Sequence, residues 1–201
     1  MGFIGTSPPA ARITADGATE QARIAAQVDT AGSKNMPGHI AFFKDSVGRI
    51  SVLRYLQAFA SIPKGALVTN VHAAEATTGG VSSSVLSQDP HMVTVASIGK
   101  FDNGPICKGI SAAEVNAAGY WSWYYIGGYC PDAAMPTSYA SGQAMRMSAT
   151  YAGRLSSAQI NASFACVGAT IPIHTVAIAL GVASSASANS TGSVVINGWL
   201  M

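Results

Sequence analysis

Charged residues are scarce in this sequence. Its 201 residues include 11 Lys and Arg and 9 Asp and Glu, so 10% are charged, against about 25% in typical soluble domains. The net charge of +2 produces no strong field that would attract nucleic acid or an anionic membrane surface. With so few charged residues, the chain has few side chains suited to a surface exposed to water. We therefore predict that further copies or a larger assembly cover much of it; the alternative is a monomer coated with Ser, Thr and Gly.

Long hydrophobic runs are missing as well. The longest apolar run extends from Ile171 to Ala183 and contains His174. A membrane-spanning helix needs about 20 predominantly apolar residues. The sequence therefore predicts no membrane partner.

Only three cysteines occur, and their spacing fits no known framework. Cys107, Cys130 and Cys166 form no C-x-x-C pair and no zinc-ligand pattern. An odd number of widely spaced cysteines is typical of free, buried thiols. We predict no metal site, no cofactor and no disulfide framework, which fits synthesis in a reducing cytoplasm.

Sequence motifs of enzymes are also absent. There is no G-x-S-x-G, no phosphate-binding loop and no G-x-G-x-x-G, and the four histidines are scattered at positions 39, 72, 91 and 174. Catalysis needs a nucleophile, a base and an orienting group within reach of one another. We predict that the protein is not an enzyme and has no catalytic residues. A Cys-dependent hydrolase using Cys130, Asp132 and a distant histidine is the weakest alternative.

Short runs rich in β-branched and aromatic residues make up most of the chain after Pro63. Turn residues separate these runs, among them Asp102–Gly104 and the pair Gly127–Gly128. This pattern predicts a mainly β fold, a small barrel or sandwich of short antiparallel strands with one or two short helices. The predicted strands are 65–71, 91–101, 105–111, 119–130, 144–151, 174–182 and 192–201.

The segment from Ile40 to Ala60 permits two interpretations. The turn "DSVG" would pair Ile40–Lys44 with Arg49–Arg54 as a hairpin. However, Leu53, Leu56 and Phe59 also fit one face of a helix. Periodicity alone leaves the choice between helix and strand open for Leu53–Ala60.

The first 38 residues differ from the rest of the chain. They contain Pro8, Pro9 and Pro37 in turn-rich stretches, and only residues 18–28 could form a short helix. We predict an extended N-terminal arm over residues 1–38 and a β-rich domain over 39–201. The arm would be ordered by contacts with other subunits, with Arg12 and Arg23 as its anchoring charges.

The stretch "AAGYWSWYYIGGYC", residues 117–130, holds six of the sixteen aromatic residues. Side chains alternate between the faces of a strand, so one face would carry Trp121, Trp123 and Tyr125 and the other Tyr120, Ser122, Tyr124 and Ile126. Both faces are largely apolar, which predicts burial of the strand, with Trp121 and Trp123 facing inward.

Aromatic rows can also bind ligands. Stacking of nucleic-acid bases is combined with cations that neutralise phosphate, but no Lys or Arg occurs between Gly109 and Met145. We therefore predict no nucleic-acid partner. Sugar binding on an exposed Trp or Tyr face remains the main alternative, and the exposure of these rings is its test.

Two segments resemble structural proteins of tailed-bacteriophage virions. "KGISAAEVNAAGYWSWYYIGGYC" is similar to their pattern A-x-x-G-x-Y-G-W-V-x-x-x-G, and "HTVAIALGVASSASANSTGSVVINGW" is similar to their terminal β run. The likeness covers residues 65–201 in general style; Ser122 and Tyr124 depart from the Gly and Val usual in the pattern. The resemblance implies a capsid decoration (cement) protein, a β-rich homotrimer on the outer surface of the head, made in the host cytoplasm and bound to the major capsid protein.

This resemblance agrees with the low charge, because a cement protein acts by burying surface between neighbouring subunits. The residues expected at the core or the interfaces are Tyr120, Trp121, Trp123, Tyr124, Tyr125, Arg12 and Arg23. A host-glycan-binding virion module using the same aromatic strand is the second hypothesis.

Overall fold

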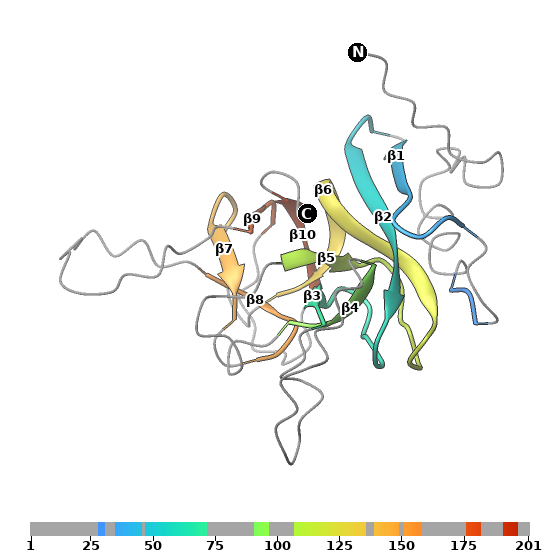
Figure 1. Ribbon diagram of the computed structural model, residues 1–201. Helices are drawn as coiled ribbons and strands as arrows, with labels where there is room; N and C mark the ends of the chain where they lie inside the picture. Colours follow the sequence, from blue (N-terminus) through green and yellow to red (C-terminus); the bar gives the residue numbers. More distant parts are fainter. Residues whose placement is uncertain are drawn as a thin grey trace, which may run out of the picture.

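The computed structural model describes residues 28–30, 35–45, 47–71, 91–96, 107–135, 139–148, 151–157, 176–181 and 191–196. These residues form ten strands and no helix, so the prediction of a mainly β fold is confirmed (Figure 1). The strands are β1 (Ile40–Lys44), β2 (Ile50–Ala58), β3 (Leu67–Asn70), β4 (Met92–Val95), β5 (Cys107–Ser111), β6 (Trp121–Ala134), β7 (Ala144–Met147), β8 (Leu155–Ser157), β9 (Ala177–Ala179) and β10 (Thr191–Ile196).

Of the two interpretations left open for residues 40–60, the structure shows the hairpin. β1 pairs antiparallel with β2, from Ile40 opposite Arg54 to Lys44 opposite Ile50. In the turn, Asp45 Oδ1 accepts hydrogen bonds from the N–H groups of Val47 and Arg49. β2 continues to Ala58, so the helical interpretation of Leu53–Ala60 is wrong. Alternate side chains of β2 enter two different clusters of buried residues, which a strand allows and a helix does not.

Five strands close into a ring in the order β2–β4–β3–β5–β6–β2. Each strand pairs through both of its edges, as these Cα partners show: Gln57 with Met92 and Trp121, Val93 with Ala58 and Asn70, Val68 with Val95 and Gly109, Ile110 with Leu67 and Tyr125. We refer to this ring as the barrel. All its pairings are antiparallel except that of β2 with β4, which is parallel, whereas the sequence predicted only antiparallel strands.

The longest strand, β6, corrects one predicted turn. Gly127 and Gly128 do not end a strand; they lie within β6, where its pairing with β2 ends and its pairing with β10 begins. Gly128 has a φ of 70°, and a Cβ on it would collide with the carbonyl oxygen of Ile50. The two glycines therefore let one strand bend through a close approach to its neighbour, and β6 belongs to both halves of the fold (Figure 1).

Beyond β6 the sheet continues in the order β10–β9–β7–β8. Its far end returns to the barrel at Gly153, which precedes β8. The Gly153 N–H donates to the Ala96 carbonyl, and the Gly153 carbonyl accepts from the Leu67 N–H, both at 2.7 Å. This second group of strands therefore packs against the β3 side of the barrel.

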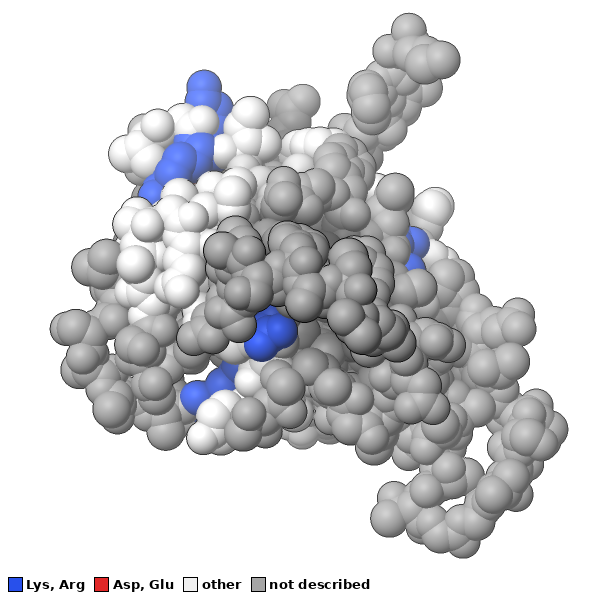
Figure 2. Space-filling model, turned by 90° about the vertical axis from the view of Figure 1, so that its left-hand side faces the viewer, with Lys and Arg blue, Asp and Glu red and all other residues white. Residues whose placement is uncertain are grey.

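Ion pairs are few on the described surface. Arg49 pairs with Asp45 at 2.6 Å and Lys64 with Asp132 at 2.9 Å. On the face shown in Figure 2, Lys and Arg side chains are visible in several places, and no Asp or Glu of a described residue is. Although charged residues are few, those of the described residues seen on this face are all positive.

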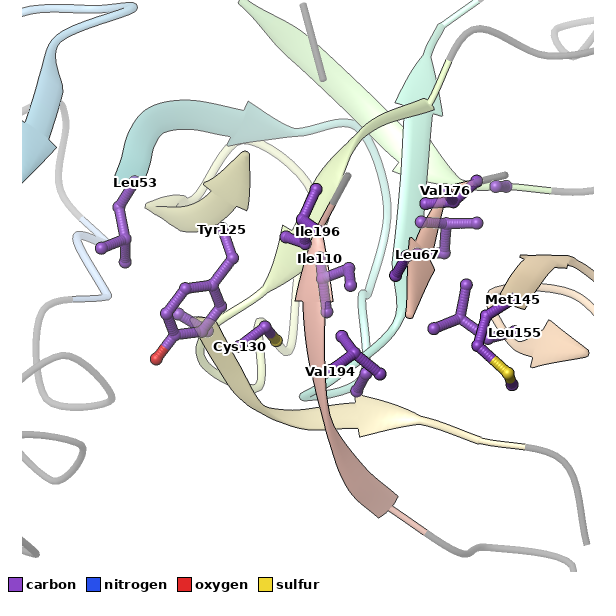
Figure 3. Close-up of a cluster of buried hydrophobic side chains, with 14 of the residues drawn as sticks. Leu53, Leu67, Ile110, Tyr125, Cys130, Met145, Leu155, Val176, Val194 and Ile196 are labelled. Carbon is purple, nitrogen blue, oxygen red and sulfur yellow. The ribbon is translucent and has the colours of Figure 1, made fainter. Parts of the chain in front are cut away.

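Two clusters of buried residues lie on the two faces of the shared strands. The smaller, called here the inner cluster, lines the barrel and contains Leu56, Ala58, Ile62, Ala66, Val68, Val93, Val115 and Tyr124. The larger, called here the outer cluster, lies between the barrel and the second group of strands (Figure 3). Its labelled members converge from β2, β3, β5, β6, β7, β8 and β10; they include Leu53, Leu67, Ile110, Tyr125, Val194 and Met145.

Part of the predicted N-terminal arm packs on its own chain. Asp29 is buried and forms two backbone hydrogen bonds with Trp121, of 2.9 and 3.0 Å. Residues 35–38 turn into β1, and the Gly38 N–H donates to the Tyr55 carbonyl at 2.8 Å. The predicted helix at 18–28 falls almost entirely outside the described residues.

Candidate functional site

The aromatic strand is buried on both faces, as its alternation predicted. Trp123 and Tyr124 are 0% exposed and Tyr125 is 3% exposed, whereas Tyr120 and Trp121 are half-buried. Trp121, Trp123 and Tyr125 lie against the outer cluster, and Tyr120 and Tyr124 against the inner cluster. The structure thus brings together all five aromatic candidates; Arg12 and Arg23 lie outside the described residues.

Ring contacts hold the aromatic side chains that lie on the outer-cluster face of this strand. The Tyr55 and Trp121 rings stack at 5.5 Å with an interplanar angle of 16°, and Tyr55 meets Trp123 at 5.1 Å with a tilt of 58°. Trp121 is the first residue of β6, and its backbone pairs there with that of Asp29. A sugar platform needs an open ring face, and Trp123 offers none.

The described cysteines are poor nucleophiles. Burial raises the pKa of the Cys107 thiol to about 11 and raises that of Cys130, which is fully buried, further still. The thiolate, not the thiol, is the nucleophile, so little of it is present at neutral pH. This chemistry weighs against a hydrolase that uses Cys130; Cys166 lies outside the described residues.

Within the described ranges, no three His, Cys, Asp or Glu side chains lie close enough together to hold a metal ion. The same ranges include no helix long and apolar enough to cross a membrane.

One end of the barrel is lined by polar residues. This end is the one at which β4 and β5 begin. β3 ends there, because β3 is antiparallel to both strands. Asn70, His91 and Lys108 therefore lie at the same end. The Arg54 side chain of β2 reaches this end too, because it lies beside His91. Both side chains border Gly38: a Cβ on that glycine would be 2.7 Å from His91 Nδ1 and 3.5 Å from Arg54 Nη2.

Two hydroxyl groups of β6 face the same interior. Tyr124 is the Cα partner of Arg54, and Ser122 is the partner of Leu56, a member of the inner cluster. Directly opposed residues of neighbouring strands project to the same face. Both hydroxyl-bearing residues are 0% exposed. We refer to Arg54, Asn70, Lys108, Ser122 and Tyr124 as the polar end of the barrel.

Four of these five side chains carry a buried polar atom that has no hydrogen-bond partner in the described part of the chain. The atoms are Arg54 Nε, Asn70 Oδ1, Ser122 Oγ and the Tyr124 hydroxyl oxygen. Of these atoms, the Tyr124 hydroxyl is close enough to Ser111 for a weak side-chain interaction, although the Ser111 hydroxyl donates its own hydrogen bond to the Ala113 carbonyl at 2.7 Å. Each such group costs about 1–3 kcal/mol when buried without a partner. An external group with matching atoms would recover part of that free energy.

The polar end is also positively charged. Burial, and next the nearby Arg54 charge, lower the pKa of Lys108. The described acidic residues lie elsewhere: Asp29 accepts from Tyr55, Asp45 pairs with Arg49, Asp132 pairs with Lys64, and Glu114 is exposed beside Val115. Among the described residues, the charges of Lys108 and Arg54 thus interact with no neutralising carboxylate paired to either.

A second feature lies on the outer surface of the second group of strands. Tyr129, Val195 and Ile178 are consecutive Cα partners across β6, β10 and β9, so their side chains form one row. Ile178 is 38% exposed and Val195 37%, and Leu180, two residues beyond Ile178, is 42% exposed. We call Tyr129, Ile178, Leu180 and Val195 the apolar strip.

The β1–β2 hairpin borders this strip. The Arg49 guanidinium lies over the Tyr129 ring, with its central carbon 3.6 Å from the ring centroid. Val47 and Ile50, close to Arg49 in the hairpin, are also largely exposed. Exposed apolar side chains that gather across several strands are typical of a protein–protein contact surface.

Sequence reasoning missed both features. Arg54 lies inside the run "SVLRYLQA", and a charged residue within a strand that is apolar on both faces is a signal that could have drawn attention to it. Ser122 was noted only as the polar exception in the aromatic strand. The apolar strip had no such signal, because its row exists only through the pairing of three distant segments.

Comparison with models of known protein families gives no match for this chain, and comparison with curated protein sequences gives no significant match.

Proposed function

We propose that the protein is a virion structural protein, a capsid decoration (cement) protein that binds the outer surface of a tailed-bacteriophage head. In this proposal it acts as a homotrimer, and its partners are further copies of itself and the major capsid protein. It is not an enzyme and needs no cofactor.

The observation that carries the proposal is the apolar strip. Ile178, Leu180 and Val195 are exposed and Tyr129 is half-buried; all except Leu180, which directly follows β9, lie on hydrogen-bonded strands of the sheet. A preorganised surface loses little conformational entropy on binding, so more of the buried area contributes to affinity. The low charge of the chain reduces the cost of desolvating such a contact.

The glycan hypothesis gains no support from the aromatic strand. Its central ring, Trp123, is fully buried in the outer cluster, where it contacts Tyr55, and leaves no face for a sugar. The half-buried Trp121 has one side stacked on Tyr55.

Co-sedimentation with assembled heads tests the proposal. Purified protein added to heads of the encoding phage that lack it should bind in a stoichiometric number of copies. Val195→Lys should weaken this binding by about tenfold or more, which corresponds to a loss of about 1.4 kcal/mol. Phe59→Lys is the matched control, because Phe59 is 40% exposed and lies outside the strip.

Binding in substoichiometric amounts, or equal binding by the two variants, would contradict the proposal. The trimer is tested separately by the molar mass of the purified protein in light scattering.

A further inference from the structure

We propose that the polar end of the barrel binds a small oxyanion, with phosphate preferred over carboxylate. This inference is independent of the proposed capsid function, because it concerns the interior of the barrel and not the apolar strip.

The arrangement supplies donors and charge from three strands. Arg54 of β2 has an Nε–H group that is buried and forms no hydrogen bond within the described ranges, and Tyr124 lies directly opposite it on β6. Ser122 is two residues from Tyr124 on the same face. Arginine and hydroxyl groups on one face of neighbouring strands are donors of the kind that bind anionic oxygen in proteins.

Charge at this end favours an anion over water or a cation. Lys108 of β5 lies near enough to Arg54 for the two charges to repel each other. An anion between them would relieve this repulsion. The low dielectric of the barrel interior strengthens such an interaction relative to the same contact at a surface.

Asn70 decides between the two classes of oxyanion. Its buried Oδ1 is an acceptor and, within the described ranges, has no partner. A hydrogen phosphate carries a proton that it can donate to this oxygen, whereas an ionised carboxylate has none to donate. A phosphate group therefore matches the donors and the acceptor together.

Thermal unfolding of the full chain, with inorganic phosphate as the probe, tests this inference. Phosphate should raise the unfolding midpoint of the wild type progressively, because a ligand that binds only the folded state stabilises it. Sodium chloride at equal ionic strength should leave the unfolding midpoint unchanged, and acetate should raise it less than phosphate does. Phosphorus NMR of the same samples should show a broadened phosphate line.

Variants locate the site. Arg54→Met keeps the apolar stem and removes the charge, and Lys108→Met does the same on β5. Each should weaken phosphate binding by about tenfold or more, as expected for the loss of one charged hydrogen bond. Lys44→Met is the matched control, because Lys44 is exposed on β1 and should leave the response to phosphate unchanged.

Tyr124→Phe provides a readout that survives a failure of the charge variants to fold. It removes only a hydroxyl that forms no hydrogen bond of normal geometry among the described residues and has at most a weak contact with Ser111, so in phosphate-free buffer the variant should be about as stable as the wild type. In phosphate it should gain less stability than the wild type does. The proposal is overturned if phosphate leaves the wild-type midpoint unchanged, or if it raises the midpoints of wild type, Arg54→Met and Tyr124→Phe equally.

Discussion

The hydroxyl of Tyr55 donates a hydrogen bond to Oδ2 of Asp29, and both residues are buried. Tyr55 belongs to β2 of the barrel, whereas Asp29 belongs to the segment that precedes β1. This contact, with the backbone pairing of Asp29 and Trp121, attaches the end of the predicted N-terminal arm to the domain.

Tyr55→Phe should lower the free energy of unfolding by about 1–3 kcal/mol, because it leaves the buried Asp29 carboxylate without this donor. Urea unfolding followed by circular dichroism measures the change. Tyr151→Phe is the matched control, since Tyr151 is 61% exposed, and should change stability little. Wild-type stability in Tyr55→Phe would contradict the structural role assigned to the Tyr55–Asp29 contact.

Two truncations should separate the arm into two parts. Removing residues 1–27 keeps Asp29 and should leave the unfolding free energy close to that of the full chain. Removing residues 1–34 also deletes Asp29 and leaves the Tyr55 hydroxyl buried without this acceptor, so it should cost several kcal/mol. In the capsid proposal, the shorter deletion should bind heads poorly because it lacks Arg12 and Arg23. If it binds as well as the full chain, the arm is not an anchor.

Trp123→Ala should destabilise the protein by about 3–5 kcal/mol, the usual cost of removing a large buried ring. Phe59→Ala, at a largely exposed position, should cost far less. Acrylamide should quench the fluorescence of Trp123 weakly, which is measured as the difference between wild type and Trp123→Phe. Strong quenching of this component would show an accessible ring and would revive the glycan hypothesis.

Gly128→Ala should be more destabilising than Gly142→Ala. Both glycines have positive φ, 70° and 78°, so both substitutions incur backbone strain of about 1 kcal/mol. Only at Gly128 would the new Cβ meet a backbone atom, the Ile50 carbonyl oxygen; around Gly142 nothing lies within 4 Å. Chemical denaturation of both variants gives the difference, and equal losses would mean that the close approach in β6 is unimportant.

Stability should fall as the pH rises from about 9 towards 11. Burial raises the pKa of Cys107 from 9.0 to about 11, so in this interval the thiol ionises in the unfolded chain but stays protonated in the folded one. Below pH 9 both states are protonated and the contribution is constant. The loss attributable to Cys107 is at most about 1.4 kcal/mol per pH unit. Urea midpoints should therefore decline less steeply with pH in Cys107→Ala; parallel curves would contradict the assignment.

The strands themselves could largely be predicted from the sequence. The run "HMVTVASIGKF" contains β4, and "GSVVINGWLM" contains all of β10 except its first residue; the turn at Asp45 indicated the β1–β2 hairpin as one of two interpretations. The alternation in "YWSWYYI" also predicted that both faces of β6 are buried. These features are local, because side-chain alternation and turn chemistry depend on residues only a few positions apart.

The pairing of the strands, by contrast, was decided by the tertiary structure. The parallel contact of β2 with β4 closes the barrel, and the Gly127–Gly128 pair continues a strand instead of ending it. The polar end and the apolar strip depend on these pairings, since Arg54 meets Tyr124 and Val195 meets both Tyr129 and Ile178 only across strands distant in sequence. A period-two pattern specifies which side chains share a face of one strand, but it carries no information about which strand lies alongside.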